Sequence, residues 1–275
     1  VIDVGTNSVK LLVADVAGHD VQPVREDSKQ TRLGRGFFET HRLQPEAITA
    51  TTLAVTRFAS EARALKAGSV RIIATSAARD ATNQKDLVSA IQDATALPLE
   101  IISGDQEADW AFQGVTTDPA LAQRPLLLLD VGGGSTEFIL GHGEQKHFRQ
   151  SFRIGTVRLL ETIPPSDPPT QAEFTETRQW IREFILKKVV PELQPALRRE
   201  VELHAAHEPV ALVGTGGTTS ILARMEAELE DYDRALIEAT RLSLERVRWH
   251  NERLWSLPLA RRQDIVGLPR KRADV

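Results

Sequence analysis

The sequence predicts an α/β protein built from two similar halves. Strand-like apolar segments alternate with amphipathic, helix-like segments along most of the 275 residues, and this alternation is typical of α/β domains. A short motif also repeats, because residues 3–8 (DVGTNS) return 127 residues later as 130–135 (DVGGGS). This spacing is far longer than the period of a solenoid or propeller, so the repeated unit is the size of a domain.

Each copy of the motif predicts a β-hairpin. An apolar strand ends at Asp3 or Asp130, a tight glycine-bearing turn follows, and a second apolar strand begins at once. The second strand covers Val9–Val16 in the first copy and Thr136–Leu140 in the other. Glycine supplies the backbone freedom that such a turn needs. We therefore expect two similar hairpins, one in each half.

Further strands and helices complete the first half. The stretch Pro45–Leu65 predicts a helix whose apolar stripe comprises Ile48, Leu53, Val55 and Phe58. The other predicted elements are strands at Val21–Ser28, Val70–Ala74 and Leu99–Ile102, and helices at Thr82–Ala96 and Gly104–Val115. The stretch 116–125, which contains two prolines, is the predicted linker. The domains are accordingly predicted at 1–118 and 119–275.

In the second half, strands and helices alternate again as far as the strand at Val210–Val213. Its further predicted strands are Pro125–Asp130, Lys146–Ile154 and Val210–Val213. A helix is predicted over Gln171–Val190 and should end at Pro191, because proline cannot continue the hydrogen-bond ladder of a helix. The remainder, from about Thr218, is predicted to be helical and Arg-rich, and the sequence stops at Val275 without a closing strand or helix. We therefore expect a second domain that is truncated at its C-terminal end.

The composition excludes several classes of protein. Apolar residues make up 41% and charged residues 26%, with a net charge of −4, as in an ordinary globular protein. The lack of cysteine rules out disulfides, thiolate nucleophiles and Cys-ligated metals. No apolar run is long enough to cross a membrane, and the small basic excess after Leu244 is common at solvated chain ends. We predict a cytoplasmic protein whose partners include neither a membrane nor a nucleic-acid polymer.

Three clusters rich in glycine, serine and threonine indicate bound phosphate. Each follows an apolar strand, and the third is 214–217 (GTGG). Glycine lets backbone N–H groups approach a ligand closely, and hydroxyl groups add donors. The Walker and dinucleotide-binding patterns are both absent. The predicted phosphate-binding residues are Gly5, Thr6, Asn7, Ser8, Gly132, Gly133, Gly134, Ser135, Thr136, Gly214, Gly216 and Gly217.

Two aspartates in the repeated motif are candidate ligands for a metal ion. Asp3 and Asp130 stand at strand ends just before their turns, where a carboxylate can hold Mg²⁺ beside bound phosphates. Bonding to nearby backbone amides is the alternative role for each aspartate taken singly. Their repetition favours the metal.

A carboxylate is the expected general base. The seven histidines are scattered without a ligand spacing and are predicted to lie at the surface. Glu107 follows Ser103 at the start of a predicted helix, near the sheet edge where α/β ligand sites gather. The alternative is a purely structural role, because a negative charge stabilises the positive N-terminal end of a helix. Arg79, on a loop of small residues, is either a surface residue or a forked phosphate ligand.

Five segments together resemble the exopolyphosphatase/guanosine pentaphosphate phosphohydrolase family. They are 1–8 (VIDVGTNS), 74–80 (ATSAARD), 102–108 (ISGDQEA), 130–137 (DVGGGSTE) and 214–218 (GTGGT), in order along essentially the whole chain. Residues 272–274 (RAD) resemble a late motif of the same family. The resemblance implies two ribonuclease-H-like domains of the actin-like, sugar-kinase and heat-shock ATPase superfamily, with a cleft between them.

The resemblance also implies roles for individual residues. Glu107 corresponds to the family's catalytic glutamate, and Arg79 corresponds to its phosphate-binding arginine. Glu137 matches a second acidic residue associated with metal and catalysis, and Asp130 matches the aspartate on the metal side. Arg158 lies in a segment similar to another family motif and is a weaker candidate.

The expected activity is hydrolysis of a terminal phosphoanhydride bond. The resemblance implies a Mg²⁺-dependent enzyme that acts on inorganic polyphosphate or guanosine pentaphosphate, with Glu107 activating the attacking water. Two alternatives stay open at this point. One is a kinase of the same superfamily, and the other is a non-catalytic actin-like module that binds nucleotide or phosphate. A homodimer is compatible with each of them.

Overall fold

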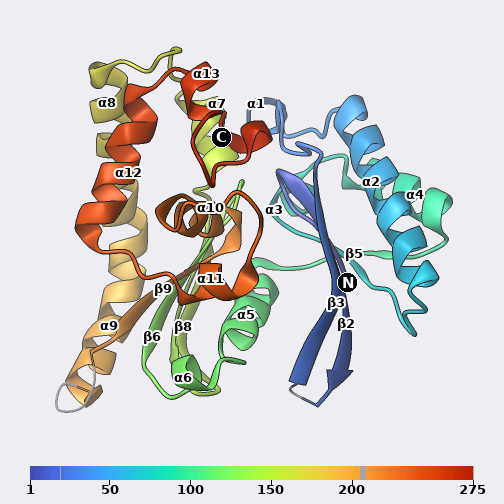
Figure 1. Cartoon of the computed structure of the whole chain (residues 1–275), viewed down its shortest axis with the longest axis horizontal. Helices are drawn as coiled ribbons and strands as arrows, with labels where there is room; N and C mark the ends of the chain where they lie inside the picture. Colours follow the sequence, from blue (N-terminus) through green and yellow to red (C-terminus); the bar gives the residue numbers. More distant parts are fainter. Residues whose placement is uncertain (19, 205–208, 275) are drawn as a thin grey trace.

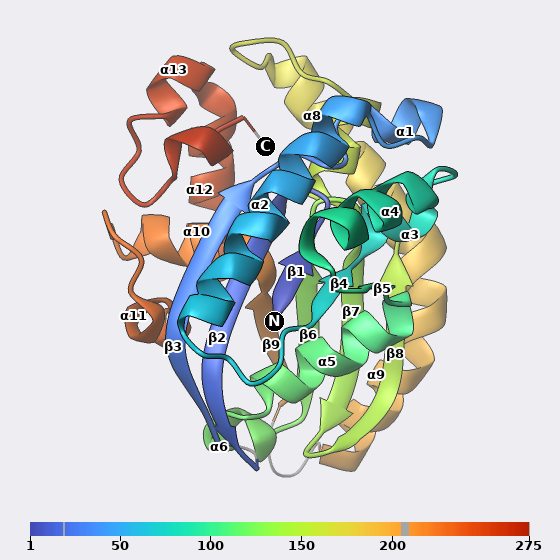
Figure 2. The same cartoon turned by 90° about the vertical axis from the view of Figure 1, so that its right-hand side faces the viewer.

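The chain forms two β-sheets that are flanked by helices (Figure 1). The computed structural model describes residues 1–18, 20–204 and 209–274. A view turned by 90° shows the first sheet and its helices in front of the second sheet (Figure 2). The predicted α/β class, with two similar halves, is confirmed.

The first sheet is built by residues 2–101. Its strands are β1 (Ile2–Val4), β2 (Ser8–Ala17), β3 (Asp20–Gln30), β4 (Ile72–Ala74) and β5 (Leu99–Ile101), and its helices are α1 (Phe37–Thr40), α2 (Pro45–Ala64), α3 (Ser76–Asp80) and α4 (Gln84–Thr95). The strand order is β3-β2-β1-β4-β5. The first three strands form an antiparallel meander, and β4 and β5 run parallel to β1.

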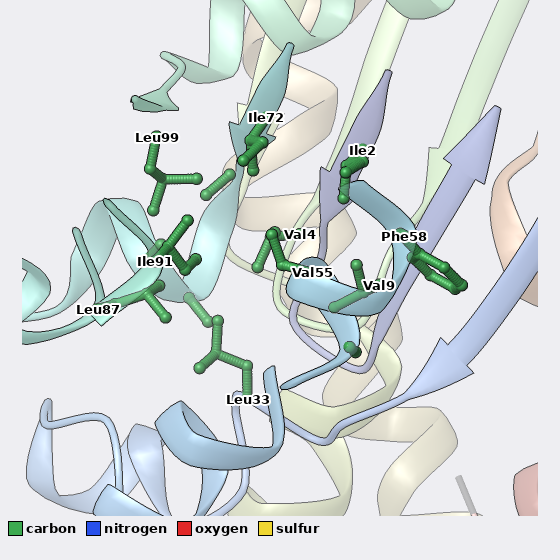
Figure 3. Packing of buried hydrophobic residues seen from close by; sticks show 14 of the residues in the cluster. Ile2, Val4, Val9, Leu33, Val55, Phe58, Ile72, Leu87, Ile91 and Leu99 are labelled. Carbon is green, nitrogen blue, oxygen red and sulfur yellow. The ribbon is translucent and has the colours of Figure 1, made fainter. Parts of the chain in front are cut away.

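Helices α2 and α4 cover this sheet and bury its apolar side chains (Figure 3). The predicted stripe on α2 is confirmed at Val55 and Phe58, which are fully buried. It is wrong at Leu53, which is 67% exposed. Each helical residue advances by about 100°, so Leu53 lies about 200° from Val55 and faces away from the sheet.

The second sheet is built by residues 126–215. Its strands are β6 (Leu126–Val131), β7 (Thr136–His142), β8 (Gln145–Phe152) and β9 (Ala211–Thr215), in the order β8-β7-β6-β9. The first three again form an antiparallel meander, and β9 runs parallel to β6. One face of the sheet packs on α5 (Gly104–Val115), and the other packs on α9 (Val190–His204).

The remaining helices connect strands or follow the second sheet. They are α6 (Pro119–Ala122), α7 (Thr156–Thr162), α8 (Gln171–Phe184), α10 (Gly216–Glu226), α11 (Arg234–Ala239), α12 (Leu244–Ser256) and α13 (Leu259–Arg262), with a 3-10 turn at Arg270–Arg272. In the described part of the chain, no helix is both long enough and apolar enough to cross a membrane.

The internal repeat is confirmed in backbone detail. The Gly5 N–H donates to Ser8 O at 3.0 Å in the first hairpin, and the Gly132 N–H donates to Ser135 O at the same distance in the second. Each hairpin also lies beside a parallel strand, β4 or β9. Both halves therefore contain the ribonuclease-H-like arrangement that the resemblance implies.

The helix predicted over 171–190 does not end at Pro191. α8 runs into a π-helical segment, Ile185–Val189, and continues as α9, with Pro191 in its first turn and Pro195 in its interior. The wider π turn interrupts the regular hydrogen-bond ladder just before Pro191. The missing N–H of Pro191 therefore falls at the start of a new helical stretch, where proline is tolerated.

α5 follows the last strand of the first sheet but packs on the second sheet. Its buried residues Ala108 and Phe112 contact Leu126 and Ile139 of β6 and β7. The domain boundary at residue 118 stays a prediction, although this packing favours a division at the start of α5. As a consequence, Glu107 in the first turn of α5 lies at the junction of the two halves.

We expect Phe112→Ala to lower the free energy of unfolding by about 3–5 kcal/mol, the usual cost of emptying a buried phenylalanine site. Urea unfolding followed by circular dichroism measures this change. Leu53→Ala, at an exposed position on α2, should change the free energy by less than about 0.5 kcal/mol. A similarly small effect of Phe112→Ala would contradict the packing of α5 on the second sheet.

Candidate active site

The turns of the two hairpins face each other where the two sheets meet. A Cβ placed on Gly134 would lie 2.6 Å from Ser76 Oγ and 2.8 Å from Thr6 Oγ1, so the second turn contacts the first turn and the start of α3. Thr6 and Ser135 are each only 4% exposed. The structure therefore brings the first two predicted phosphate loops together at one buried place.

Both turns direct peptide carbonyls away from this place. In the first turn, Thr6 O accepts the Gly34 N–H at 2.8 Å, and Asn7 O accepts the Arg32 N–H at 2.9 Å. In the second turn, backbone N–H groups at the start of α7 bind the carbonyls in the same way. The C=O of a planar trans peptide points opposite to the following N–H. The N–H groups of both turns are therefore presented on the other side, in rows of the kind that bind anions.

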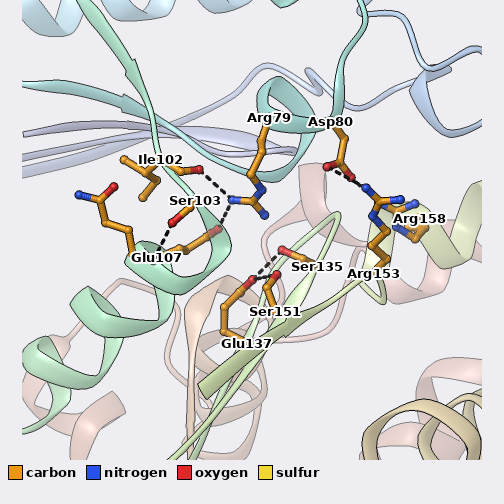
Figure 4. A network of polar contacts seen from close by, with 11 residues as sticks. Arg79, Asp80, Ile102, Ser103, Glu107, Ser135, Glu137, Ser151, Arg153 and Arg158 are labelled. Atoms are coloured by element: carbon orange, nitrogen blue, oxygen red, sulfur yellow. Dashed lines mark hydrogen bonds and ion pairs between the residues drawn. The ribbon is translucent and has the colours of Figure 1, made fainter. Parts of the chain in front are cut away.

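Arg79 and Glu107 form an ion pair beside these turns (Figure 4). Arg79 comes from α3, and its Nη1 donates to Glu107 Oε2 at 2.9 Å and to Ile102 O at 3.1 Å. Ser103 Oγ accepts the Gln106 N–H and so caps α5 by itself. Within the described residues, Glu107 therefore makes no capping hydrogen bond of its own, and its carboxylate is turned to Arg79. Its favourable charge in the first turn of the helix stays the alternative role.

Glu137 lies next to this pair and is held by two serine hydroxyls. Ser135 Oγ donates at 2.9 Å and Ser151 Oγ donates at 2.6 Å, both to Glu137 Oε1. Glu137 is 1% exposed. Because both hydroxyls use Oε1, they orient the carboxylate and do not occupy Oε2. Sequence reasoning missed Ser151, which lies directly opposite Glu137 in the β7–β8 register, and this pairing is the signal that would have found it.

Burial gives the two glutamates unusual acid–base properties. It raises the pKa of Glu107 to about 8, with the charge of Glu137 adding to the increase and Arg79 opposing it. Burial likewise raises the pKa of Glu137 to about 7, against the lowering effect of the Ser151 and Ser135 hydroxyls. A carboxyl group with a pKa near the working pH is suited to proton transfer in catalysis.

Asp3 and Asp130 lie near the equivalent ends of β1 and β6 and offer oxygen ligands. Asp3 Oδ1 is buried and has no hydrogen-bond partner within the described residues. Asp130 Oδ1 faces Gly216, where a Cβ would approach it to 2.4 Å. Burial raises the pKa of both aspartates, and the positive charge of Lys10 opposes only part of this increase. A carboxylate oxygen without a hydrogen-bond partner is the type of ligand that Mg²⁺ prefers.

The aspartates do not form a complete metal cage. Across residues 1–18, 20–204 and 209–274, no group of three or more carboxylates or imidazoles is placed to enclose a metal ion. Mg²⁺ at phosphate sites commonly takes only one or two carboxylates and completes its shell with water and phosphate oxygens. Asp3, Asp130 and Glu137 stay the predicted ligands on that basis.

The third glycine cluster reaches the site only in part. Gly216 lies beside Asp130, whereas a Cβ on Gly214 would meet Thr219 of the same segment at 2.8 Å. A Cβ on Gly217 would lie 3.5 Å from the guanidinium of Arg272. Gly216 therefore lies beside the predicted metal position and Gly217 beside the late motif, whereas Gly214 packs within its own segment.

The late motif at 272–274 reaches back to the first half. Arg272 Nη1 donates to Ser8 Oγ at 3.4 Å, and Asp274 forms an ion pair with Arg32 at 2.8 Å. Arg158, the weaker candidate, lies behind the second turn, where its Nε donates to Gly134 O at 2.8 Å. The late motif and the segment around Arg158 thus both contact the repeated turn motifs, Arg272 the first copy and Arg158 the second.

The prediction that every histidine lies at the surface is wrong for His250. This residue is 1% exposed, and its Nε2 lies 2.7 Å from Glu226 Oε2, which Arg246 also contacts. A carboxylate partner compensates for the burial of a polar ring, so His250 joins α12 to α10. His19 and His207 lie outside the described residues.

Comparison with known proteins identifies the family. A model of the Ppx/GppA phosphatase family matches residues 12–275. The chain belongs to this family. Exopolyphosphatase 2 of Mycobacterium tuberculosis is 37% identical over 283 aligned residues, which cover all of this chain and 85% of that protein. A bifunctional 3-dehydroquinate synthase/phosphatase of Fusobacterium nucleatum is 27% identical, over all of this chain and 40% of that protein.

Solved structures confirm the fold. An exopolyphosphatase from Cytophaga hutchinsonii matches with a TM-score of 0.81 and 26% identity, over 99% of this chain and 84% of that chain. The PPX-GPPA enzyme of Aquifex aeolicus matches with a TM-score of 0.73 and 27% identity, over 99% and 86%. The predicted actin-like fold of two ribonuclease-H-like domains is therefore confirmed.

We expect kcat/KM of this phosphatase to rise with pH if Glu107 is the general base that the resemblance implies, because a base must lose its proton before it can accept one from water. Burial raises the Glu107 pKa to about 8, so the rising limb should lie well above the ordinary glutamate value of 4.5. Arg79→Met removes a cation that lowers this pKa, and it should move the limb to higher pH. The pH profile of initial rates measures both effects.

Arg71→Met is the matched control for Arg79→Met. Arg71 pairs with Glu100 at the surface, so its loss should leave the limb where it is. A limb that stays in place in Arg79→Met would show that Glu107 does not set the pH dependence.

Proposed function

We propose that this protein is a Mg²⁺-dependent exopolyphosphatase. It removes the terminal phosphate from inorganic polyphosphate, from guanosine pentaphosphate or from both, since the two compounds end in the same phosphoanhydride bond. The observation that carries the proposal is the half-buried Glu107 carboxylate, which Arg79 holds beside two facing glycine turns. The similarity to Exopolyphosphatase 2 of M. tuberculosis supports polyphosphate as the substrate.

The two turns would bind the terminal phosphoryl group. Its oxygens accept hydrogen bonds from the N–H groups of residues 6–8 and 133–136, and the Arg79 guanidinium adds a positive charge. The Gly5 N–H is not among these donors, because it closes the first turn by donating to Ser8 O. Phosphoryl transfer needs little covalent help from a protein, because positioning and electrostatic stabilisation lower most of the barrier. Amides that are already aimed supply this stabilisation without reorganisation.

Glu107 acts as the general base. As a water oxygen bonds to the terminal phosphorus, a proton of that water passes to the Glu107 carboxylate. The bridging P–O bond breaks, and its electron pair leaves with the shortened chain. Arg79 keeps the Glu107 carboxylate in place, and the raised pKa makes it a stronger base than an exposed glutamate. The proton then returns to solvent.

Asp3 and Asp130 would hold Mg²⁺, and the Oε2 atom of Glu137 would face the same region. When bound, Mg²⁺ supplies positive charge that offsets the charge on the phosphate oxygens. The protein would contribute carboxylate oxygens that are not already engaged in hydrogen bonds. Within the described residues, Asp3 Oδ1 is such an atom. A cytoplasmic location and a homodimer stay predictions.

We expect Glu107→Gln to lower the release of phosphate from polyphosphate by roughly 10²–10⁴-fold, the usual effect of losing a general base. The amide has nearly the same shape but cannot accept the proton, so folding and phosphate binding should persist. Phosphate release is measured with Mg²⁺, with polyphosphate or guanosine pentaphosphate, and without any acceptor molecule.

The same assay separates the alternatives. Glu100→Gln, at a surface ion pair with Arg71, is the matched control and should retain wild-type rates. Wild-type protein that releases phosphate only when an acceptor alcohol is added would be a kinase, and protein that binds without release would be a binding module. A Glu107→Gln rate within a few fold of wild type would remove Glu107 from the mechanism.

We expect Asp130→Asn to weaken the Mg²⁺-dependent part of ligand stabilisation. A ligand that binds only the folded state raises the melting temperature by mass action, and the neutral amide is a poorer Mg²⁺ ligand than a carboxylate. Thermal shifts are measured with polyphosphate, with and without Mg²⁺. Asp105→Asn, at an exposed site in α5, is the control. An unchanged Mg²⁺ effect in Asp130→Asn would exclude Asp130 as a ligand.

A further inference from the structure

α7 begins directly behind the second glycine turn and binds its carbonyl groups. The Thr156 N–H donates to Gly132 O at 3.1 Å. The N–H groups of Val157 and Arg158 donate to Gly133 O at 2.9 and 3.0 Å. The N-terminal amides of α7, which elsewhere would attract an anion, are therefore used by the turn itself.

The close approach of α7 requires glycine at position 155. A Cβ there would lie 2.5 Å from both the carbonyl carbon and the carbonyl oxygen of Gly133. Backbone atoms cannot move aside as the end of a side chain can, so any larger residue would push the turn away from α7. Gly155 thus fixes the turn and α7 against each other.

The side chain of Arg158 binds the next carbonyl along the turn. Its Nε donates to Gly134 O at 2.8 Å. The rest of the guanidinium contacts the first half of the protein, with Nη2 3.4 Å from Asp80 Oδ2 and the central carbon 4.2 Å from the centre of the Phe38 ring. The Arg158 side chain is 15% exposed. It is therefore held firmly between the turn and the first half.

The contact with Gly134 O determines where the next amide points. Because C=O and N–H lie on opposite sides of a planar trans peptide, Arg158 turns the Ser135 N–H away from itself. In Figure 4, Ser135 lies between Arg158 on one side and the two glutamates on the other. Within the described residues, the N–H groups of Gly133, Gly134 and Ser135 have no backbone acceptor. They are available to a ligand on the glutamate side.

We propose that Arg158 is a positioning residue, which aims the Ser135 amide at the terminal phosphoryl group by holding Gly134 O. The inference rests on the proposed function, because it names what one residue does for that reaction. It differs from the role of phosphate ligand that a positively charged residue in a phosphatase first suggests. A ligand would reach the front of the turn, whereas the Arg158 guanidinium lies behind it.

Two substitutions separate positioning from charge. Arg158→Gln keeps an N–H donor where arginine has its Nε but removes the positive charge. Arg158→Lys keeps the charge but puts a methylene group at that place. We expect Arg158→Lys to lower kcat for polyphosphate hydrolysis roughly 10²-fold, at the low end of the effect of losing one donor to a transition-state oxygen. Arg158→Gln should retain a rate close to that of wild type.

Arg153→Gln is the matched control. Arg153 also pairs with Asp80 at 3.4 Å, but its side chain is 74% exposed, and it should have little effect on kcat. Melting temperatures of all variants are compared with wild type, so that a loss of folding is recognised directly.

A second measurement does not depend on turnover. Inorganic phosphate is titrated into ¹⁵N-labelled protein, and the amide signals of Gly133, Gly134 and Ser135 are followed. We expect the Ser135 signal to shift in wild type and in Arg158→Gln but not in Arg158→Lys. If wild type hydrolyses neither substrate, the proposed function fails, and this titration still decides the role of Arg158.

Three results would overturn the inference. Full activity in Arg158→Lys with loss in Arg158→Gln would show that only the charge matters. Wild-type rates in both variants would show that the Gly134 contact is not needed. Equal losses in both, at unchanged melting temperature, would assign the effect to the contacts with Asp80 and Phe38 and not to the carbonyl.

Discussion

The direction of a few peptide carbonyls is the constraint on which the site depends. In the first turn, Thr6 O and Asn7 O are bound by backbone amides that follow β3. In the second turn, the backbone of α7 and its Arg158 side chain together bind the carbonyls of residues 132–134. In a planar trans peptide the C=O and the following N–H point in opposite directions, so binding the oxygen on one side directs the N–H to the other side. Without these contacts the two turns would be ordinary hairpin turns. With them, two short repeated loops present amides to one shared space.

Charge is the second organising feature of this space. Four carboxyl groups from both halves lie near one another, of which Glu137 is buried and the other three, Asp3, Glu107 and Asp130, are half-buried. Loss of solvent raises the pKa of each of them, and for three of them the others' charges add to the increase. Arg79 offsets only part of this negative charge. A region that favours protonated carboxyl groups when empty also favours a bound cation, which is the electrostatic argument for the proposal that Mg²⁺ binds there.

Polar contacts join the halves around the site and so make its geometry depend on their relative position. Glu161 of α7 accepts the Gly36 N–H at 2.6 Å and the Phe38 N–H at 3.2 Å, and it thereby caps α1 in the other half. Asp274 reaches Arg32 in a similar way. These contacts are hydrogen bonds and ion pairs, not a shared apolar core. Such junctions separate more readily than a packed core does, which suits a site that must admit substrate and release phosphate.

The sequence by itself determined the class of fold, the repeat and the loops. Strand and helix periods are local properties, and the motif at 3–8 and 130–135 carries its own turn chemistry. Local rules failed where packing competes with them. Pro191 did not end a helix, because a π turn precedes it, and His250 is buried, because Glu226 is available as a partner.

Only the tertiary structure decided how the candidate residues act together. Ser151 orients Glu137, Arg158 binds Gly134 from behind, and α5 packs across the boundary that the sequence suggests. Each of these relations joins residues that are separated along the chain, and nothing in the local sequence of either partner specifies the other. Burial, which shifts the pKa of Glu107, is likewise a property of the assembled protein. The sequence specifies the types of residue in the site, whereas the distances between them and their burial are set only when the two halves fold against each other.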